Sequence, residues 1–159
     1  MKILFVCMSN ICRSPALEAV LRAEAARRHL PIIVDSCGVG WFHLGEPPDA
    51  RMAEAARKRS ITFSHSAQEF QERFFDEFDL ILAVDQDILE QLKLHATTPE
   101  RLDKLRLATT FSKKFHGQEI PDPYYLGATG FDYVMDMAED IAAGILYPNE
   151  FNSGALTQF

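Results

Sequence analysis

Short runs of apolar, β-forming residues alternate with longer amphipathic stretches along this chain, and this alternation strongly constrains its fold. The clearest runs are KILFV at residues 2–6 and FDLILAV at residues 78–84. Continuous apolar runs of this length are typical of strands buried on both faces of a parallel sheet. Between them, Leu17, Val20 and Leu21 recur with the period of a helix. The pattern predicts an α/β fold in which helices cover both faces of a parallel sheet.

The expected elements fill most of the chain. Strands are predicted at residues 2–6, 32–35, 78–84 and 104–108, and helices at residues 15–29, 49–59, 68–74, 85–95 and 129–143. Loops are predicted at residues 37–48 and 118–127, which are rich in turn-forming residues. Because no linker, repeat or low-complexity stretch interrupts the pattern, residues 1–159 are expected to form a single domain.

Charge and cysteine content narrow the function and the compartment. The net charge is −7 and the sequence pI is about 5.2, which argues against nucleic-acid binding and against adhesion to an anionic membrane. No apolar run is long enough to span a bilayer. There are three cysteines, Cys7, Cys12 and Cys37, and an odd number does not suit a disulfide framework. The histidines show no spacing typical of metal ligands. A reducing cytoplasm is the expected location.

The turn after the first strand is where a sheet of this kind is expected to bind a ligand. It reads CMSNICRSP from Cys7 to Pro15, and Arg13 stands six positions after the cysteine. A short loop that opens a helix can point successive main-chain N–H groups at one anion, and a guanidinium can add two hydrogen bonds to a phosphate. The residues expected to bind phosphate are Met8, Ser9, Asn10, Ile11, Cys12, Arg13 and Ser14.

Cys7 begins this loop, where its sulfur would lie beneath a bound phosphorus atom. The same N–H groups and helix end favour a thiolate, and Ser14 is placed to hydrogen-bond the sulfur. A Cys-x5-Arg spacing alone is a weak signal, and the competing interpretation is a buried cysteine at the end of a strand. The strand before Cys7 and the helix opened by Arg13 and Pro15 favour a nucleophile.

A second loop offers a proton donor. Asp122 lies between Pro121 and Pro123, which restrict the backbone and fix where the carboxylate points, and Tyr124 and Tyr125 follow it. Transfer of a phosphoryl group from a tyrosine ester needs a proton for the leaving oxygen. An Asp-Pro pair on its own more often marks a turn. Beside a Cys-x5-Arg loop, the interpretation of Asp122 as a general acid is favoured.

Three segments together resemble one protein family. They are VCMSNICRSP near the N-terminus, DSCGVGWFHLGEPPDARM in the middle, and DPYY followed by GFDYVMDMAEDI near the end. In order and spacing the chain is similar to the low-molecular-weight protein tyrosine phosphatases over nearly its whole length. The resemblance implies a three-layer flavodoxin-like (Rossmann-like) fold with a four-stranded parallel sheet flanked by helices.

The resemblance also implies roles for individual residues. Cys7 would be the nucleophile, Arg13 the phosphate clamp, and Asp122 the general acid and then the base that activates water. Asn10 would support the loop backbone. The substrate pocket would be formed by Trp41, Phe42, Tyr124 and Tyr125. No metal or cofactor is called for. The expected partners are phosphotyrosine proteins, with a bacterial tyrosine kinase as one candidate, and the expected state is a monomer or weak dimer.

Three alternatives to a phosphotyrosine phosphatase are weighed against particular residues. Ser9 stands where the family usually has glycine, which would strain the loop if that position needs positive φ and leaves open a catalytically silent oxyanion-binding module. A thiol-relay arsenate reductase would need two further cysteines, but no cysteine follows Cys37. In the protein-arginine phosphatases the position of Ile11 is threonine-like, which suits a polar guanidinium ester. The isoleucine here suits an aromatic ring instead.

Overall fold

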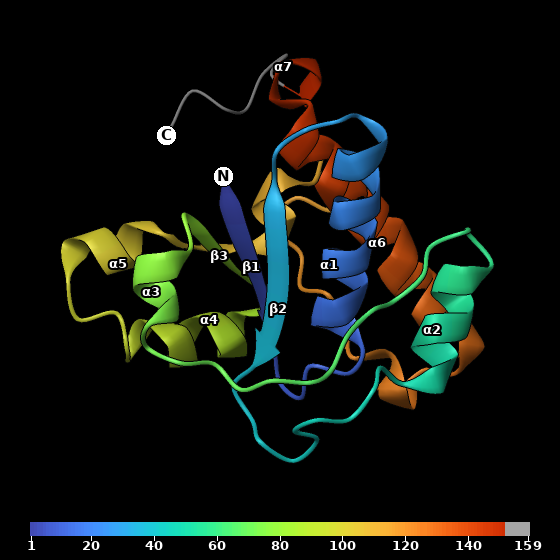
Figure 1. Ribbon diagram of the computed structural model, residues 1–159, viewed down its shortest axis with the longest axis horizontal. Coiled ribbons are helices and arrows are strands. Elements are labelled where there is room, and N and C mark those ends of the chain that lie inside the picture. The colour runs from blue at the N-terminus through green and yellow to red at the C-terminus, as the bar shows by residue number, and fades with distance from the viewer. Residues whose placement is uncertain (152–159) are drawn as a thin grey trace.

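The computed structural model describes residues 1–151, in which four strands form one parallel sheet (Figure 1). The strands are β1 (Lys2–Cys7), β2 (Ile33–Gly38), β3 (Leu80–Ala83) and β4 (Leu105–Leu107), in the order β2-β1-β3-β4. Strand β1 pairs with β2 on one side and with β3 on the other, so the chain moves to one edge of the sheet first and crosses to the other edge later. Connections therefore diverge at the C-terminal end of β1, where a sheet of this type leaves a crevice.

Helices cover both faces of the sheet. They are α1 (Arg13–Arg27), α2 (Ala50–Arg57), α3 (Phe74–Glu77), α4 (Gln86–Lys93), α5 (Pro99–Asp103), α6 (Ala128–Leu146) and α7 (Pro148–Phe151), with short 3-10 turns η1 (Ala108–Phe111) and η2 (Pro123–Tyr125). Figure 1 shows α1 and α6 on one face and α3, α4 and α5 on the other, with α2 beyond α6. The four-stranded parallel α/β fold expected from the sequence is confirmed.

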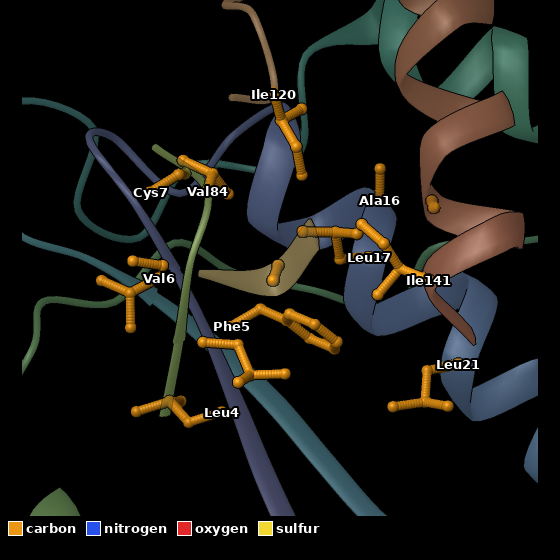
Figure 2. Close-up of a cluster of buried hydrophobic side chains, with 14 of the residues drawn as sticks. Leu4, Phe5, Val6, Cys7, Ala16, Leu17, Leu21, Val84, Ile120 and Ile141 are labelled. Atoms are coloured by element: carbon orange, nitrogen blue, oxygen red, sulfur yellow. The ribbon is translucent and has the colours of Figure 1, made fainter. Parts of the chain in front are cut away.

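The core forms around β1, whose residues Ile3 to Val6 are fully buried. Phe5 extends toward the face of the sheet that α1 and α6 cover, where Leu17 and Ile141 lie. Val6 points to the opposite face (Figure 2). Burial on both faces explains why β1 is continuously apolar rather than alternating. A fully buried aliphatic or aromatic side chain contributes about 1.5–3 kcal/mol, so β1 is a firm support for the loop that follows it.

The four predicted strands and four of the five predicted helices are confirmed, with small shifts of their ends. The predicted helix at residues 68–74 is wrong. Its first part, residues 68–70, is extended and pairs with the end of β2: the N–H of Gly38 donates to the carbonyl of Gln68 at 2.8 Å, and the N–H of Phe70 donates to the carbonyl of Gly38 at 2.7 Å. The chain then turns, and α3 begins at Phe74. The short helices α3, α5 and α7 were not predicted, although Thr98 caps the first turn of α5. Within residues 1–151, no helix has the length and apolar character that crossing a membrane requires.

Candidate active site

A cavity of about 250 Å³ lies at the C-terminal edge of the sheet, over the turn between β1 and α1. Its lining consists of loop residues Cys7 to Arg13 together with His43, Asp122, Tyr124 and Tyr125. These residues come from three segments that are far apart in the sequence. The parallel sheet brings them together because β1 and β2 end at the same edge, and the loop that carries Asp122 is fixed to the end of β3 by the hydrogen bond from the N–H of Ile120 to the carbonyl of Val84.

Cys7 is buried at the base of the cavity and has two hydrogen-bond partners. The main-chain N–H of Asn10 donates to Sγ at 3.2 Å, and Oγ of Ser14 lies 2.9 Å from the same sulfur. Both groups can donate to a thiolate. Within residues 1–151, no atom accepts a hydrogen bond from the main-chain N–H groups of Ser9, Ile11 or Cys12. These amides remain free to bind an oxyanion above the sulfur.

Asn10 fixes the shape of the loop. Its φ is 57°, a left-handed conformation that asparagine tolerates better than most residues. Its side-chain amide donates to Oγ of Ser14 at 2.8 Å and to Oγ of Ser36 at 2.9 Å, and Oδ1 accepts from the N–H of Gln68 at 2.9 Å. Ser9 does not adopt positive φ. The strain considered for Ser9 is therefore absent, because the left-handed turn falls one residue later.

Arg13 is held from behind while part of its guanidinium stays available. Nη1 donates to a carboxylate oxygen of Asp85 at 2.7 Å and to the carbonyl of Ile120 at 3.0 Å. Nε and Nη2 have no partner among residues 1–151, although the side chain is largely buried. A guanidinium clamped on one edge in this way is oriented for two hydrogen bonds to a phosphate on its other edge.

Asp122 reaches the same cavity from the loop before α6. Its Oδ1 accepts from the main-chain N–H of Tyr124 at 3.0 Å, so the carboxylate caps the 3-10 turn η2. Tyr124 and Tyr125 flank it as a pair of aromatic walls, with ring centroids 5.1 Å apart. A buried thiol, an amide-lined anion site, a guanidinium and a carboxyl group thus share one small cavity. This is the set of groups that phosphoryl transfer to sulfur requires.

The family model described as low molecular weight phosphotyrosine protein phosphatase matches residues 2–153 of this chain. The chain belongs to that family. A low molecular weight protein-tyrosine-phosphatase of Streptomyces coelicolor is 37% identical over 91% of each chain. The crystal structure of a protein tyrosine phosphatase from Entamoeba histolytica, 34% identical, superposes with a TM-score of 0.88 over 94% of this chain and 97% of its own. A Drosophila arginine phosphatase, 29% identical, superposes with a TM-score of 0.85 over 97% and 99%.

In this member of the phosphatase family, the mouth of the cavity differs from the expectation drawn from the sequence. Trp41 and Phe42 do not line the cavity; their rings stack on each other with centroids 4.8 Å apart, and both are well exposed. The neighbouring His43 lines it instead, with Nδ1 2.7 Å from a carboxylate oxygen of Glu46. Ser14 also lies outside the lining, because it supports Cys7 from behind.

The phosphatase cavity holds two thiols, and only one suits a nucleophile. Burial, followed by the negative charge of Asp49, raises the pKa of Cys12 to about 12. Cys12 is therefore a neutral thiol at neutral pH, and a neutral thiol is a poor nucleophile. Among the described residues, no main-chain N–H and no hydroxyl contacts the sulfur of Cys12, whereas both contact the sulfur of Cys7. The local environment thus distinguishes two cysteines that the loop sequence alone presents as similar.

Sequence reasoning missed a buried polar cluster behind the phosphatase loop. Glu18 contacts Ser36, with Oε1 3.3 Å from Oγ, and its other oxygen lies 3.7 Å from Nδ1 of His65. Nε2 of His65 lies 2.9 Å from the carbonyl of Asn10. Burial raises the pKa of Glu18 to about 8, and burial lowers the pKa of His65. At neutral pH Glu18 therefore keeps its proton and His65 is neutral, so the two groups together hold one titratable proton.

This pair is expected to make stability fall as the pH rises above neutrality. In the unfolded chain Glu18 loses its proton near pH 4.5 and His65 near pH 6.5, whereas the folded pair keeps one proton until about pH 8. Between pH 6.5 and 8 the folded state therefore binds one proton more than the unfolded state. The free energy of unfolding should drop by about 2 kcal/mol across this window.

Urea unfolding at a series of pH values would measure this slope. In Glu18→Gln the slope should disappear, since His65 alone would release its proton earlier in the folded state than in the unfolded state. Glu24→Gln, on the same helix but with its carboxylate on Arg27 at the surface, should keep the wild-type slope. Equal slopes in wild type and Glu18→Gln would show that Glu18 does not keep this proton in the folded state.

Proposed function

We propose that this chain hydrolyses phosphotyrosine in proteins through a phosphocysteine intermediate. One observation supports this most strongly: Cys7, the free main-chain amides of its loop, Arg13 and Asp122 face a single cavity. Family membership supports the same reaction class. In this proposal Met8 to Arg13 bind the phosphate, Ser14 supports Cys7 from behind, and Tyr124 and Tyr125 hold the phenyl ring of the substrate.

The first step transfers the phosphoryl group to sulfur. The thiolate of Cys7 attacks phosphorus in line with the leaving oxygen, forming the S–P bond as the P–O bond to tyrosine breaks. Asp122 gives its proton to that oxygen, so tyrosine leaves as a neutral phenol. The loop amides and the free edge of Arg13 stabilise the charge on the three equatorial oxygens.

The second step returns the enzyme to its starting state. Asp122, now a carboxylate, takes a proton from a water molecule that attacks phosphorus from the side vacated by tyrosine. The S–P bond breaks, phosphate leaves, and Asp122 is protonated again. Ser14, 2.9 Å from Sγ, eases the departure by donating a hydrogen bond to the thiolate that forms.

Phosphoarginine is the second candidate substrate, since one structural neighbour is an arginine phosphatase. We favour phosphotyrosine because Ile11 and the rings of Tyr124 and Tyr125 give the cavity apolar walls for a phenyl ring. Parallel assays on matched phosphotyrosine and phosphoarginine peptides, with EDTA present, decide between them. Faster turnover of phosphotyrosine is expected. Faster turnover of phosphoarginine would reverse the choice, and no turnover of either would favour a binding module.

The setting of the activity is part of the same proposal. The substrates are phosphotyrosine proteins, with a tyrosine kinase as one candidate partner, and residues 1–159 act as one domain, monomeric or weakly dimeric. We place the protein in the cytoplasm because a nucleophilic thiol survives best in a reducing compartment. Cys7, Cys12 and Cys37 are all free thiols. Size measurement by light scattering would test the oligomeric state.

A further inference from the structure

Arg51, in the first turn of α2, lies between the phosphate loop and the loop that carries Asp122. Its guanidinium carbon is 4.8 Å from the ring centroid of Tyr124 and 4.8 Å from that of Phe131. Nη1 also lies 3.5 Å from the carbonyl oxygen of Tyr124. A guanidinium stacked on an aromatic ring and pointing at the backbone of the same residue restricts that residue in both position and orientation.

Asp49 ties this arginine to the phosphate loop. Its carboxylate accepts from Nε of Arg51 at 3.1 Å and from Nη2 at 3.0 Å, and its main-chain N–H donates to the carbonyl of Ile11 at 2.8 Å. The hydrogen bonds to Arg51 lower the pKa of Asp49, so the carboxylate stays ionised. A continuous set of contacts therefore runs from Ile11 through Asp49 and Arg51 to Tyr124.

Asp122 lies between two anchored residues. Upstream, Ile120 is fixed to the sheet edge, since its N–H donates to the carbonyl of Val84 at 2.9 Å and its own carbonyl accepts from Arg13. Downstream, Tyr124 donates its N–H to the Asp122 carboxylate at 3.0 Å and is itself held by Arg51. Without Arg51, the downstream anchor would rest on η2, a single 3-10 turn that packs on α6 through its buried Pro123.

Arg51 is not placed to bind the substrate phosphate. It does not line the phosphate cavity but lines a separate groove between α2 and α6. Its Nε and Nη2 are both directed to Asp49. Loss of Arg51 should therefore spare anion binding while changing the geometry of the acid loop.

We propose that Arg51 is a positioning residue that holds Asp122 in place for proton transfer to the leaving oxygen. The inference rests on the proposed phosphatase activity and goes beyond it by assigning the acid loop a specific support. Small displacements of a proton donor cost rate in proportion to how much the leaving group needs the proton. The effect of Arg51 must therefore depend on the leaving group.

Arg51→Lys tests this, since lysine keeps the charge but cannot form the two-pronged contact with Asp49 or stack its head group on Tyr124 in the same way. The measurement is kcat/KM for p-nitrophenyl phosphate, which has a weakly basic leaving group, and for phenyl phosphate, which has a strongly basic one. We expect the loss to be about tenfold larger for phenyl phosphate. The inhibition constant of inorganic phosphate should stay within about twofold of wild type.

Two further variants make the test specific. Arg59→Lys is the matched control, because Arg59 also links the α2 region to α6, through Asp136 at 2.9 Å and Glu139 at 3.3 Å, but does not contact Tyr124. In Arg59→Lys, kcat/KM should either be unchanged or fall by the same factor for the two substrates. In an Asp122→Asn background, Arg51→Lys should add little further loss, because a positioning residue has no effect once the group it positions is gone.

The outcomes separate this inference from the proposed function. A wild-type enzyme that turns over neither substrate would overturn the proposed function itself. With an active wild type, an equal loss on both substrates in Arg51→Lys, or a full additional loss in the Asp122→Asn background, would overturn the role of Arg51. A weakened phosphate inhibition constant would instead assign Arg51 to anion binding and would also overturn the inference.

Discussion

Replacing Cys7 with serine is expected to lower turnover of p-nitrophenyl phosphate by about four orders of magnitude or more. Serine has a hydroxyl where the enzyme needs a thiolate, and two hydrogen-bond donors cannot ionise an alcohol whose proton is held far more strongly. Cys12 cannot replace Cys7 as the nucleophile, since burial keeps its thiol protonated. Steady-state kinetics at neutral pH, with EDTA present, measures the loss.

Binding should survive this change, which separates loss of chemistry from loss of fold. The free amides of Ser9, Ile11 and Cys12 and the clamp of Arg13 do not depend on sulfur. Calorimetry should therefore detect phosphate binding to Cys7→Ser with an affinity within about tenfold of wild type. Cys37→Ala is the matched control, because Cys37 is a buried free thiol outside the cavity. Substantial turnover by Cys7→Ser would refute the role of Cys7.

Replacing Asp122 with asparagine should have the second-largest effect, a loss of about 10²–10³-fold on phenyl phosphate. Asparagine has nearly the same shape and can still accept the N–H of Tyr124 through its amide oxygen, so η2 should keep its geometry. It cannot donate a proton to the leaving oxygen and cannot take one from water. The loss should be clearly smaller for p-nitrophenyl phosphate, whose leaving group needs less help.

The leaving-group dependence is the decisive part of this prediction. It is measured as kcat/KM over a series of aryl phosphates, which reports the first transfer step. Asp85→Asn gives a useful contrast, because Asp85 holds Arg13 and not the acid loop. That variant should weaken phosphate inhibition and lower the rate for all leaving groups alike. A uniform loss in Asp122→Asn would assign the proton transfer to another group.

The fold could be predicted from the sequence where local pattern and tertiary structure agree. Strand β1 is apolar throughout because both of its faces are buried, and α6 carries its apolar stripe where it packs on α1. The prediction failed at residues 68–74 because Phe70 and Phe74 have a helical spacing but pack edge-to-face within an aromatic cluster. Long-range pairing with Gly38 overrides the local pattern there.

The candidate site follows the same division. The phosphate loop is contiguous, so the order of Cys7, Arg13 and Ser14 contains most of its geometry. The groups that support it come from elsewhere: Ser36 and Gln68 fix Asn10. No spacing in the sequence links these distant residues to the loop, since only the fold makes them neighbours. Trp41 and Phe42 show the same limit, because the turn at residues 42–45 brings His43 to the cavity while the rings of Trp41 and Phe42 stack outside it.

The most direct test of the account is to observe the phosphoryl group on sulfur. Wild-type enzyme is mixed with excess p-nitrophenyl phosphate, quenched within milliseconds in neutral denaturant, digested and mapped by mass spectrometry. We expect one phosphoryl group on the peptide that contains Cys7, absent from Cys7→Ser and removed by treatment that cleaves S–P bonds. An active enzyme that shows no such adduct, or shows it on another residue, would contradict the mechanism.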